Sequence, residues 1–354
     1  MSDTQEHPSY QLAHAVFAGG GVRGIAHVGA LEIAEQRGYR WHSVAGTSAG
    51  AIVAALVAAG YRAEELYTMM QEIDYSRFAT CPDYDLLHVT EMSNIFMRGG
   101  LHDSSHIEEF VQEKLYAKGI NTFEDLLIAE QAQNSDLFQR YRLTVIASDI
   151  TQGRMVRLPQ DAHLYGIDPN ALHVARAVRM SASIPFFFIP TYLTDANGMS
   201  SCIVDGGLLS NFPLFLFEHS SPTHDIIPTF GFQLVDTTQQ HIVNTVGTNG
   251  SVPTGGSINM LKALVSTMLS AHDRLYMNDE TFAHTITIPT SGITSTQFNL
   301  TKAQAQYLYE SGKTAATTFF KTWDFEAFKA TYRNNNSPIT PLHAQVHEMV
   351  KSRE

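Results

Sequence analysis

Cysteine is scarce in this chain of 354 residues, which contains only Cys81 and Cys202. Small secreted proteins that lack a sizeable core depend on several disulfides, and two cysteines cannot form such a framework. A chain of this length can instead bury a substantial hydrophobic core. We therefore expect both cysteines to be structural thiols in a reducing compartment. The cysteines and histidines show no zinc-binding spacing, so no metal site is expected.

Long hydrophobic runs and an excess of positive charge are also missing. The longest apolar stretch, Ala49 to Ala59, is too short to span a bilayer, and residues 1–11 are too polar for a secretory signal. We expect no transmembrane segment, and either a cytoplasmic location or delivery by a route that needs no signal peptide. The net charge of −12 argues against nucleic acid binding and against strong attraction to anionic membranes. Contact with lipid is then expected to be peripheral, through local apolar loops.

A serine at the centre of a glycine-framed turn is the first candidate for chemistry. Residues 43–45 predict the end of a strand, and the apolar run that ends before Gly60 predicts a helix. In a G-x-S-x-G turn between a strand and a helix, the glycines keep side chains away and the serine hydroxyl is exposed over the end of the sheet. We predict that this serine is a nucleophile. The turn consists of Gly46, Thr47, Ser48, Ala49 and Gly50.

A bare loop precedes this turn, between a predicted strand at 15–17 and a predicted helix from Ile25 to Gly38. Unpaired N–H groups at the start of a helix favour negative charge, and glycines let a ligand approach the backbone closely. Such donors stabilise the oxyanion that forms when a serine attacks a carbonyl. We predict that the three leading glycines form an oxyanion hole. The loop consists of Gly19, Gly20, Gly21, Val22, Arg23 and Gly24.

The same loop also matches G-x-G-x-x-G, the pattern of dinucleotide-binding βαβ units. That interpretation requires an acidic residue about 20 residues on, at the end of the second strand. Here the second strand, at 43–46, carries no acid and leads directly into the serine turn. A nucleotide- or phosphate-binding module that uses Gly19 to Gly24 therefore stays a remote alternative.

A nucleophilic serine needs a base, and Asp205 is the best candidate. It follows two apolar residues of a predicted strand and begins the sequence Asp205-Gly206-Gly207, although Asp-Gly is also the commonest turn dipeptide. A Ser–Asp–His esterase that uses His219, His224 or His272 is the alternative. In the α/β-hydrolase fold of such esterases the nucleophile usually follows several strands, whereas Ser48 follows only the second predicted strand.

Taken together, these motifs resemble the patatin-like phospholipase family. Its pattern is a G-G-G-x-[RK]-G loop, a G-x-S-x-G nucleophile and a D-G-[GA] acid, and all three occur here in that order. Three further stretches also look like the family: Arg142 to Leu158, Ala177 to Pro190 and Asp205 to Pro213.

The resemblance implies a serine acyl hydrolase that cleaves fatty acyl esters of phospholipids, as a phospholipase A or lysophospholipase. It implies that Ser48 is activated directly by Asp205, without a histidine, and that the N–H groups of Gly20 and Gly21 bind the oxyanion. A lipase for neutral lipids is a further alternative. The resemblance implies no metal or organic cofactor, and it does not determine whether an activating protein is needed. For a dyad without histidine we expect a pH–rate profile with no inflection near 6.5.

The resemblance also assigns positions within the glycine loop. Arg23 stands where the family has Arg or Lys, between Val22 and Gly24, and a cation there can orient a phosphate head group. Its alternative is an ordinary helix-surface arginine that caps or pairs. Ala18 stands where the family often has Ser or Asp, so no side-chain contribution is expected from it.

The order of predicted elements indicates an α/β fold. Strands alternate with helices, which predicts a three-layer α/β/α arrangement with a mostly parallel central sheet and a helical C-terminal extension. We expect a patatin-like catalytic domain at 12–240, a flexible linker or loop at 241–257, and a mostly helical part at 258–354 that packs on the catalytic domain. The apolar segments 185–190 and 212–217 are predicted to line an acyl pocket, and residues 86–100 to form its cover.

Overall fold

The computed structural model describes residues 10–73, 100–134, 136–195, 197–217, 227–236 and 279–333. The chain divides into two compact units, Met1–Lys321 and Thr322–Glu354. In the second unit, helix α12 (Phe325–Tyr332) buries Phe328, whose ring packs 5.4 Å from that of Trp323. All features described below belong to the first unit.

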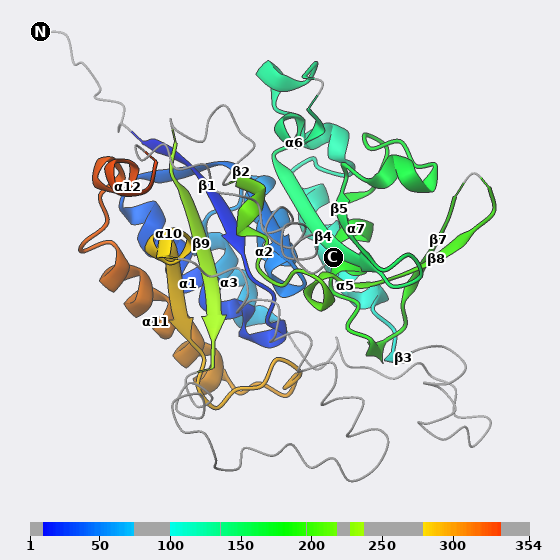
Figure 1. Ribbon diagram of the computed structural model, residues 1–354. Coiled ribbons are helices and arrows are strands. Elements are labelled where there is room, and N and C mark those ends of the chain that lie inside the picture. The colour runs from blue at the N-terminus through cyan, green and yellow to red at the C-terminus, as the bar shows by residue number, and fades with distance from the viewer. Residues whose placement is uncertain are drawn as a thin grey trace, which may run out of the picture. The chain divides into compact units, whose positions relative to one another are not determined.

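Eight strands among the described residues form one mixed sheet (Figure 1). The strand order is β10-β9-β1-β2-β4-β8-β7, and β5 pairs with β4 outside this path. Strands β10, β9, β1, β2 and β4 run parallel, whereas β5 and β8 are antiparallel to β4, and β7 is antiparallel to β8. The expected α/β fold with a mostly parallel sheet is confirmed. The strands are β1 Gln11–Phe17, β2 Tyr39–Thr47, β4 Leu143–Asp149, β5 Arg154–Leu158, β7 Thr191–Thr194, β8 Ser200–Asp205, β9 Thr229–Val235 and β10 Thr285–Pro289.

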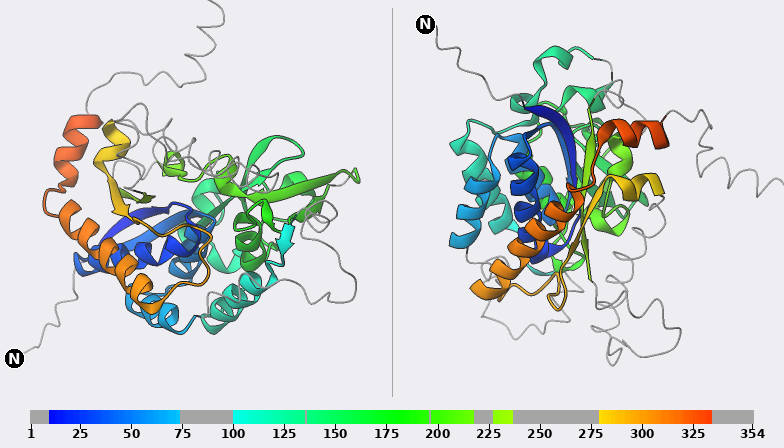
Figure 2. Two further views of the ribbon diagram at one scale, coloured as in Figure 1. Left: turned by 90° about the horizontal axis from the view of Figure 1, so that it is seen from below. Right: turned by 90° about the vertical axis from the view of Figure 1, so that its left-hand side faces the viewer.

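A second, two-stranded sheet pairs β3 (Gly100–His102) with β6 (Phe186–Phe188) in parallel. The longer helices are α1 Ile25–Gln36, α2 Ala49–Ala58, α3 Ala63–Glu72, α5 Ser105–Ala117, α7 Val174–Ser181 and α11 Lys302–Phe319. Short helices are α6 Leu137–Arg140, α10 Asp279–Ala283, η1 Gly21–Gly24, η3 Phe123–Leu126, η4 Ala129–Gln131, η5 Ala162–Tyr165, η6 Gly206–Leu208 and η7 Leu214–Phe217. In the right-hand view of Figure 2, α1, α2, α3 and α11 lie on one side of strands β1 and β9.

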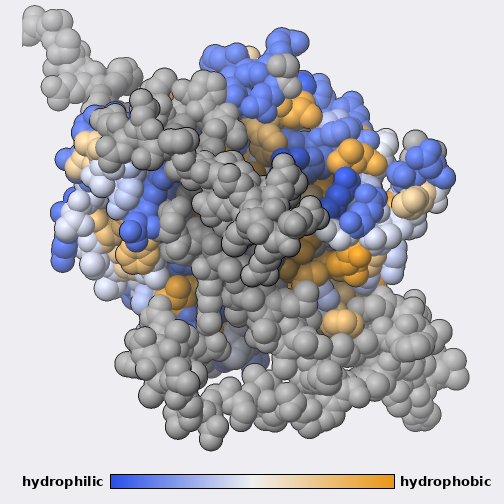
Figure 3. Space-filling view, in the orientation of Figure 1, coloured by the Kyte–Doolittle hydropathy of each residue, from blue (hydrophilic) through white to orange (hydrophobic). Residues whose placement is uncertain are grey.

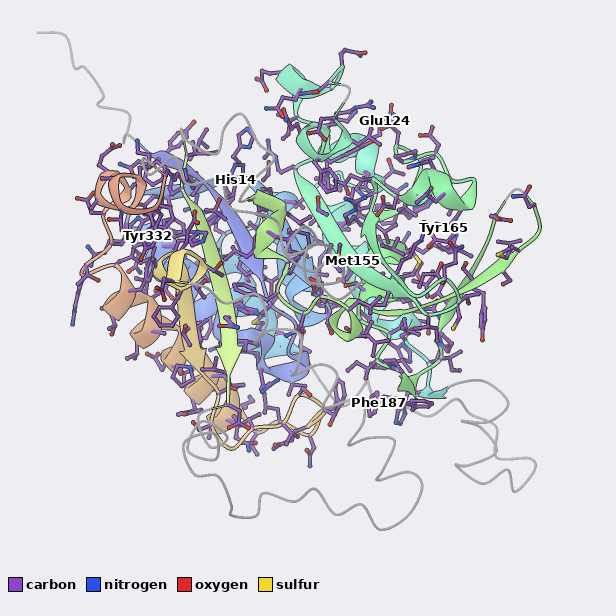
Figure 4. The ribbon with its side chains drawn as sticks, in the orientation of Figure 1. His14, Glu124, Met155, Tyr165, Phe187 and Tyr332 are labelled. Carbon is purple, nitrogen blue, oxygen red and sulfur yellow. The ribbon has the colours of Figure 1, made fainter. Side chains whose placement is uncertain are left out.

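Alternate residues of β1 point to opposite faces of the sheet, as its pleat requires. Phe17 faces the helices, with its ring 5.6 Å from that of His27 on α1. Val16 faces the other way and joins a buried cluster with residues 212–217. Met155 on β5 packs against the same cluster and is labelled in Figure 4. The apolar segment 212–217 is therefore core packing on the second face of the sheet and not a wall of an acyl pocket.

The part predicted at 258–354 contributes to the first unit as well. Strand β10 pairs with β9 at the edge of the central sheet, and α11 packs against α1. These two helices approach closely because Gly29 and Gly312 face backbone: an added Cβ on Gly29 would meet the carbonyl of Tyr309, and one on Gly312 the carbonyl of Ala26. The limits 12–240 and 258–354 stay predictions. The predicted linker at 241–257, and all of the predicted cover except Gly100, lie outside the described residues.

Candidate active site

Ser48 occupies a sharp turn between β2 and α2. Its backbone has φ 55° and ψ −125°, and Ser48 and Phe186 are the two non-glycine residues with positive φ in the described part of the chain. Such a conformation costs free energy and persists only where the surroundings enforce it. Backbone atoms lie close to both flanking glycines. An added Cβ on Gly46 would meet the carbonyl of Gly50, and one on Gly50 would meet the carbonyls of Phe17 and Ala18, which precede the glycine loop. The predicted strand–turn–helix setting of Ser48 is present.

Two hydrogen bonds outside the turn hold it in place. The N–H of Ser48 donates to Oγ of Ser181, 2.8 Å away, at the end of α7. The hydroxyl of Thr47 donates to the carbonyl of Ser210, 2.9 Å away, in the loop that follows Asp205. The elbow is thus attached both to α7 and to the loop that carries the acid.

Asp205 ends β8, opposite Ala147 of β4, and only 1% of it is exposed. Its Oδ1 accepts a hydrogen bond of 2.7 Å from the N–H of Gly207. Its Oδ2 is buried and has no hydrogen-bond partner among the described residues. Gly206 lies against β4, because an added Cβ would meet the carbonyl of Ile146. One oxygen of the carboxyl is therefore fixed, and the other is free to accept a proton.

Burial raises the pKa of Asp205 to about 6. The Ser48 hydroxyl and the Gly207 N–H both lower this pKa, but burial outweighs them. The hydroxyl is thus close enough to interact with the carboxyl, although no standard hydrogen bond joins it to Oδ2. A loose contact of this kind is common in enzymes without substrate.

The glycine loop passes directly beside the elbow, since an added Cβ on Gly19 would lie 3.2 Å from Cβ of Ser48. The N–H of Gly19 donates to the carbonyl of Asn211 at 3.0 Å, and that of Val22 to the carbonyl of Ser295 at 3.1 Å. For the N–H groups of Gly20 and Gly21, no acceptor is found in the described part of the chain. Gly19 is consequently not available as an oxyanion donor, contrary to its inclusion in the predicted hole.

His27 supports this loop from α1. It is fully buried, and its Nε2 lies 2.8 Å from the carbonyl of Ala18, so Nε2–H is the donor. Burial lowers the pKa of His27 to about 4, so the ring is neutral near pH 7. No motif in the sequence assigns a role to His27. Its position one helical turn after the glycine loop was the available signal.

Arg23 is turned toward its own loop and toward β10. Its Nε donates to the carbonyl of Gly20 at 3.2 Å, and its Nη1 lies 3.5 Å from Oγ1 of Thr290. Burial lowers the pKa of Arg23, and the charge of Asp236 opposes this effect. Arg23 does not line the pocket described below, so the phosphate contact expected of it stays a prediction. Gly24 lies against α2, with an added Cβ 3.1 Å from Cβ of Ala49.

An apolar pocket opens beside Ser48. It has a volume of about 830 Å³, including the space open to solvent. Ser48 supplies the only polar side chain among the described residues that line it. Gly21 lies in the same wall, so the glycine loop and the serine border one space. The lining comprises Gly21, Val22, Ile25, Ser48, Ala49, Ile52, Val53, Leu56, Leu66, Met69, Met70, Ile73, Ile107, Phe110, Ala182, Ile184, Phe188 and Phe298.

The segment predicted at 185–190 contributes one wall of this pocket. Phe188 lines it, and the neighbouring ring of Phe187 stacks on Phe298 with 5.1 Å between ring centres. Figure 4 shows Phe187, a residue of β6, at the lower edge of the ribbon. Phe188 of this segment thus lines an apolar pocket, and the binding of an acyl chain there stays a prediction.

No described histidine bridges Ser48 and Asp205. His284 is buried at the start of β10, where its Nδ1 lies 3.0 Å from the carbonyl of Thr229, the first residue of β9. It therefore lies just before the edge strand β10, whereas Ser48 follows β2, from which β10 is separated by β9 and β1. His219, His224, His241 and His272 lie outside the described residues. Within the described residues, no group of His, Cys, Asp or Glu side chains is arranged to hold a metal ion.

This chain is similar to several known proteins. A family model described as Patatin-like phospholipase matches residues 15–217. A protein of Bacillus subtilis (strain 168), described as uncharacterized protein YqhO, is 36% identical over 315 residues, which are 88% of this chain and 98% of that protein. A probable lipid hydrolase, 463L of Invertebrate iridescent virus 6, is 25% identical over 199 residues, which are 56% of this chain and 61% of that protein.

The chain is also similar to a solved structure, that of VipD from Legionella pneumophila. The TM-score is 0.50 at 16% identity, and the match covers 87% of this chain and 66% of that chain. At this identity the likeness concerns the fold alone.

Proposed function

Because this chain belongs to the patatin-like phospholipase family, we propose that it cleaves fatty acyl esters of phospholipids, with Ser48 as nucleophile and Asp205 as base. Membership in the family makes the chain a lipid-hydrolysing esterase. The observation that carries the proposal for the site is the placement of Ser48. It is the one polar side chain in the described lining of an apolar pocket, and it stands beside a buried carboxyl with a pKa of about 6.

In the first half-reaction, Oδ2 of Asp205 takes the proton of the Ser48 hydroxyl while Oγ attacks the ester carbonyl. The N–H groups of Gly20 and Gly21 stabilise the negative charge on the carbonyl oxygen. When the tetrahedral intermediate collapses, Asp205 returns the proton to the leaving alkoxide, which departs as the alcohol of a lysophospholipid. The acyl group stays on Ser48 as an ester.

In the second half-reaction, water takes the place of the alcohol. Asp205 removes a proton from the water, the hydroxide attacks the acyl ester, and the proton passes to Oγ as the fatty acid leaves. A base with a pKa of about 6 suits both steps, because it is ionised at neutral pH and still accepts a proton more readily than an ordinary aspartate.

Product analysis tests the substrate class. We expect the purified protein, incubated with a mixed lipid extract, to release free fatty acid together with lysophospholipid, both identified by mass spectrometry. Loss of triacylglycerol with all phospholipids intact would favour the neutral-lipid lipase instead. Release of neither product would contradict the proposal.

The partner of the site is then a phospholipid surface, contacted peripherally. No described helix is both long and apolar enough to cross a bilayer. Hydrophobic residues gather on the face shown in Figure 3 over β4, β5 and β8. Ile150, Tyr192 and Met199 are each at least half exposed on the hairpins of these strands. We propose that such local apolar residues, rather than net charge, contact lipid.

The enzyme should lose activity as the pH falls through the pKa of Asp205, because protonation removes the base. We expect kcat/KM to fall about tenfold per pH unit below an inflection near 6, because a protonated carboxyl cannot accept the proton of Ser48. The measurement is kcat/KM for a soluble short-chain ester between pH 4.5 and 9. This replaces the expectation of a profile without an inflection near 6.5, which ignored the burial of Asp205.

An organic co-solvent distinguishes this carboxyl from a histidine. Dissociation of a neutral acid creates charge, so a less polar solvent raises its pKa, whereas dissociation of an imidazolium leaves the number of charges unchanged. The inflection should therefore move to higher pH when co-solvent is added. An inflection that stays or moves to lower pH would point to a histidine as base.

The oxyanion hole is tested most cleanly at Gly20. An added Cβ there would meet only the flexible end of Leu234, whereas Gly21 has φ +57° and an added Cβ would meet the backbone of Ser295. We expect Gly20→Ala to lower turnover about ten- to a thousandfold by shifting the donors away from the substrate oxygen.

The double variant Gly20→Ala/Leu234→Ala makes room for the methyl group and should recover part of this loss. Turnover and KM are measured separately for both variants on a soluble ester. If Gly20→Ala raises KM alone, the loop is a binding surface and not an oxyanion hole.

A further inference from the structure

A short turn at the C-terminal end of α7, residues 181–183, contacts both halves of the proposed dyad. Oγ of Ser181 accepts the N–H of Ser48 at 2.8 Å. The carbonyl of Ser183 accepts the N–H of Asp205, also at 2.8 Å. Both serines are completely buried, so water does not compete for these bonds. The nucleophile and the base are thus held from one turn.

The hydroxyl of Ser181 has a defined direction. It donates to the carbonyl of Ile146 on β4 at 2.5 Å, which leaves its lone pairs for the N–H of Ser48. The next residue of β4, Ala147, pairs with Asp205. Ser48, through Ser181, and Asp205 are therefore positioned against two adjacent residues of one strand, Ile146 and Ala147.

We infer that Ser181 is a positioning residue that keeps the Ser48 hydroxyl aligned with Asp205. The inference rests on the proposed Ser48–Asp205 dyad. The backbone of Ser48 is strained, so its peptide N–H must be held from outside the turn. Without the Ser181 hydroxyl, the N–H of Ser48 and the carbonyl of Ile146 both lose a buried partner. The elbow can then relax, and the hydroxyl moves away from the carboxyl.

The turn is also attached to a wall of the pocket. Oγ of Ser183 donates to the carbonyl of Arg179 at 2.7 Å, and the Arg179 side chain contacts Ser104 at 3.0 Å and Glu108 at 3.0 Å. Helix α5, which carries Glu108, also supplies Ile107 and Phe110 to the pocket lining. The positioning turn and the proposed acyl site therefore share one polar network.

The test is the replacement Ser181→Ala, assayed on a soluble ester. We expect kcat to fall about ten- to a hundredfold with KM within about threefold of wild type, because a small misalignment affects the chemical step. The acid inflection should also move to higher pH, because the Ser48 hydroxyl no longer lowers the pKa of Asp205. A purely structural role of Ser181 would not move this inflection.

Ser201→Ala is the matched control, since Ser201 is 1% exposed on β8 and, among the described residues, Gln152 is the one hydrogen-bond partner of its Oγ. It should leave kcat and the pH profile unchanged. If Ser181→Ala does not fold, Ser181→Cys keeps the size of the side chain with a weaker donor and acceptor, and should show the same effects to a smaller extent.

A folded Ser181 variant whose kcat and acid inflection match those of wild type would overturn the inference. So would a loss of kcat with no change in the inflection. Ser48→Ala in the same assay separates the two proposals. If it is inactive while Ser181→Ala behaves as wild type, only the positioning role fails. If Ser48→Ala is active, the dyad itself fails.

Discussion

Replacement of Ser48 by alanine is expected to abolish fatty acid release from phospholipid vesicles while the protein stays folded. The side chain is 5% exposed and occupies the elbow, so alanine removes the hydroxyl with little change in volume. The N–H that bonds Ser181 is retained. Loss of a nucleophile costs several orders of magnitude in turnover, so we expect less than about a hundredth of wild-type activity.

Ser43→Ala provides a matched control for this variant. Ser43 lies on the same strand, β2, and is also 5% exposed, but the one side-chain hydrogen bond of its hydroxyl among the described residues is to the neighbouring His42. It should retain activity within a few-fold of wild type. Thermal unfolding of both variants checks the fold. A correctly folded Ser48→Ala that keeps more than about a hundredth of wild-type turnover would refute the assignment.

The replacement Asp205→Asn is expected to abolish activity almost as completely as Ser48→Ala. In a dyad the carboxylate is the only base, so labelling of Ser48 by a fluorophosphonate probe should fall nearly as far as in Ser48→Ala. In a triad the imidazole stands between serine and acid, and its loss has the same effect as loss of the serine. The measurement is the rate of probe labelling at pH 8.

Histidine variants complete this experiment. The described His284 lies just before the edge strand β10, and its replacement by alanine should leave labelling within a few-fold of wild type. We expect the same for the four histidines outside the described residues, His219, His224, His241 and His272. One histidine whose loss stops labelling in a folded variant would overturn the dyad and favour the Ser–Asp–His esterase.

The stability of Asp205→Asn provides a check that its inactivity is not unfolding. Burial raises the pKa of Asp205 to about 6, above the value of about 3.9 for an unfolded chain. Folding stability therefore falls as the pH rises from about 4 to 6 and stays lower above that range, by about 2–3 kcal/mol. Asparagine carries no charge, so at pH 8 the variant should unfold at the same or a higher temperature than wild type. Clear destabilisation at pH 8 would contradict this account of the carboxyl.

Elements with local signals could be predicted from the sequence. The helix predicted from Ile25 to Gly38 corresponds to α1, Ile25–Gln36, and the apolar run that ends before Gly60 corresponds to α2, Ala49–Ala58. The elbow around Ser48 was predictable because Gly46 is required by the backbone of Gly50 in the same turn, although Gly50 itself faces the carbonyls of Phe17 and Ala18. These features depend on neighbours in the sequence, and composition and spacing therefore reveal them.

The features that the sequence did not reveal depend on distant contacts. The N–H of Gly19 is occupied by Asn211, 192 residues further along the chain, and no local pattern indicates that bond. The support of Ser48 by Ser181 is of the same kind, although Ser181 lies in a segment that resembles the family.

The sequence also did not reveal the burial of Asp205 or the face of the sheet on which each apolar segment lies. The burial of Asp205 changes its pKa, and therefore the pH profile, yet the sequence shows only an acid at the end of a strand. The two apolar segments look alike in composition. Phe188 of the first lines the pocket, whereas residues 212–217 pack on the opposite face of β1. Only the fold decides which apolar residues form a core and which form a binding wall.

The acyl-enzyme is the most direct measure of the proposed chemistry. A synthetic phosphatidylcholine with two different acyl chains is mixed with excess protein, the reaction is quenched in acid during the first turnover, and the protein is digested for mass spectrometry. The account predicts one acyl group, added with loss of the lysophospholipid, on the peptide that carries Ser48, and no adduct in Ser48→Ala. An acyl group on any other residue, or fatty acid released by Ser48→Ala at the wild-type rate, would contradict it.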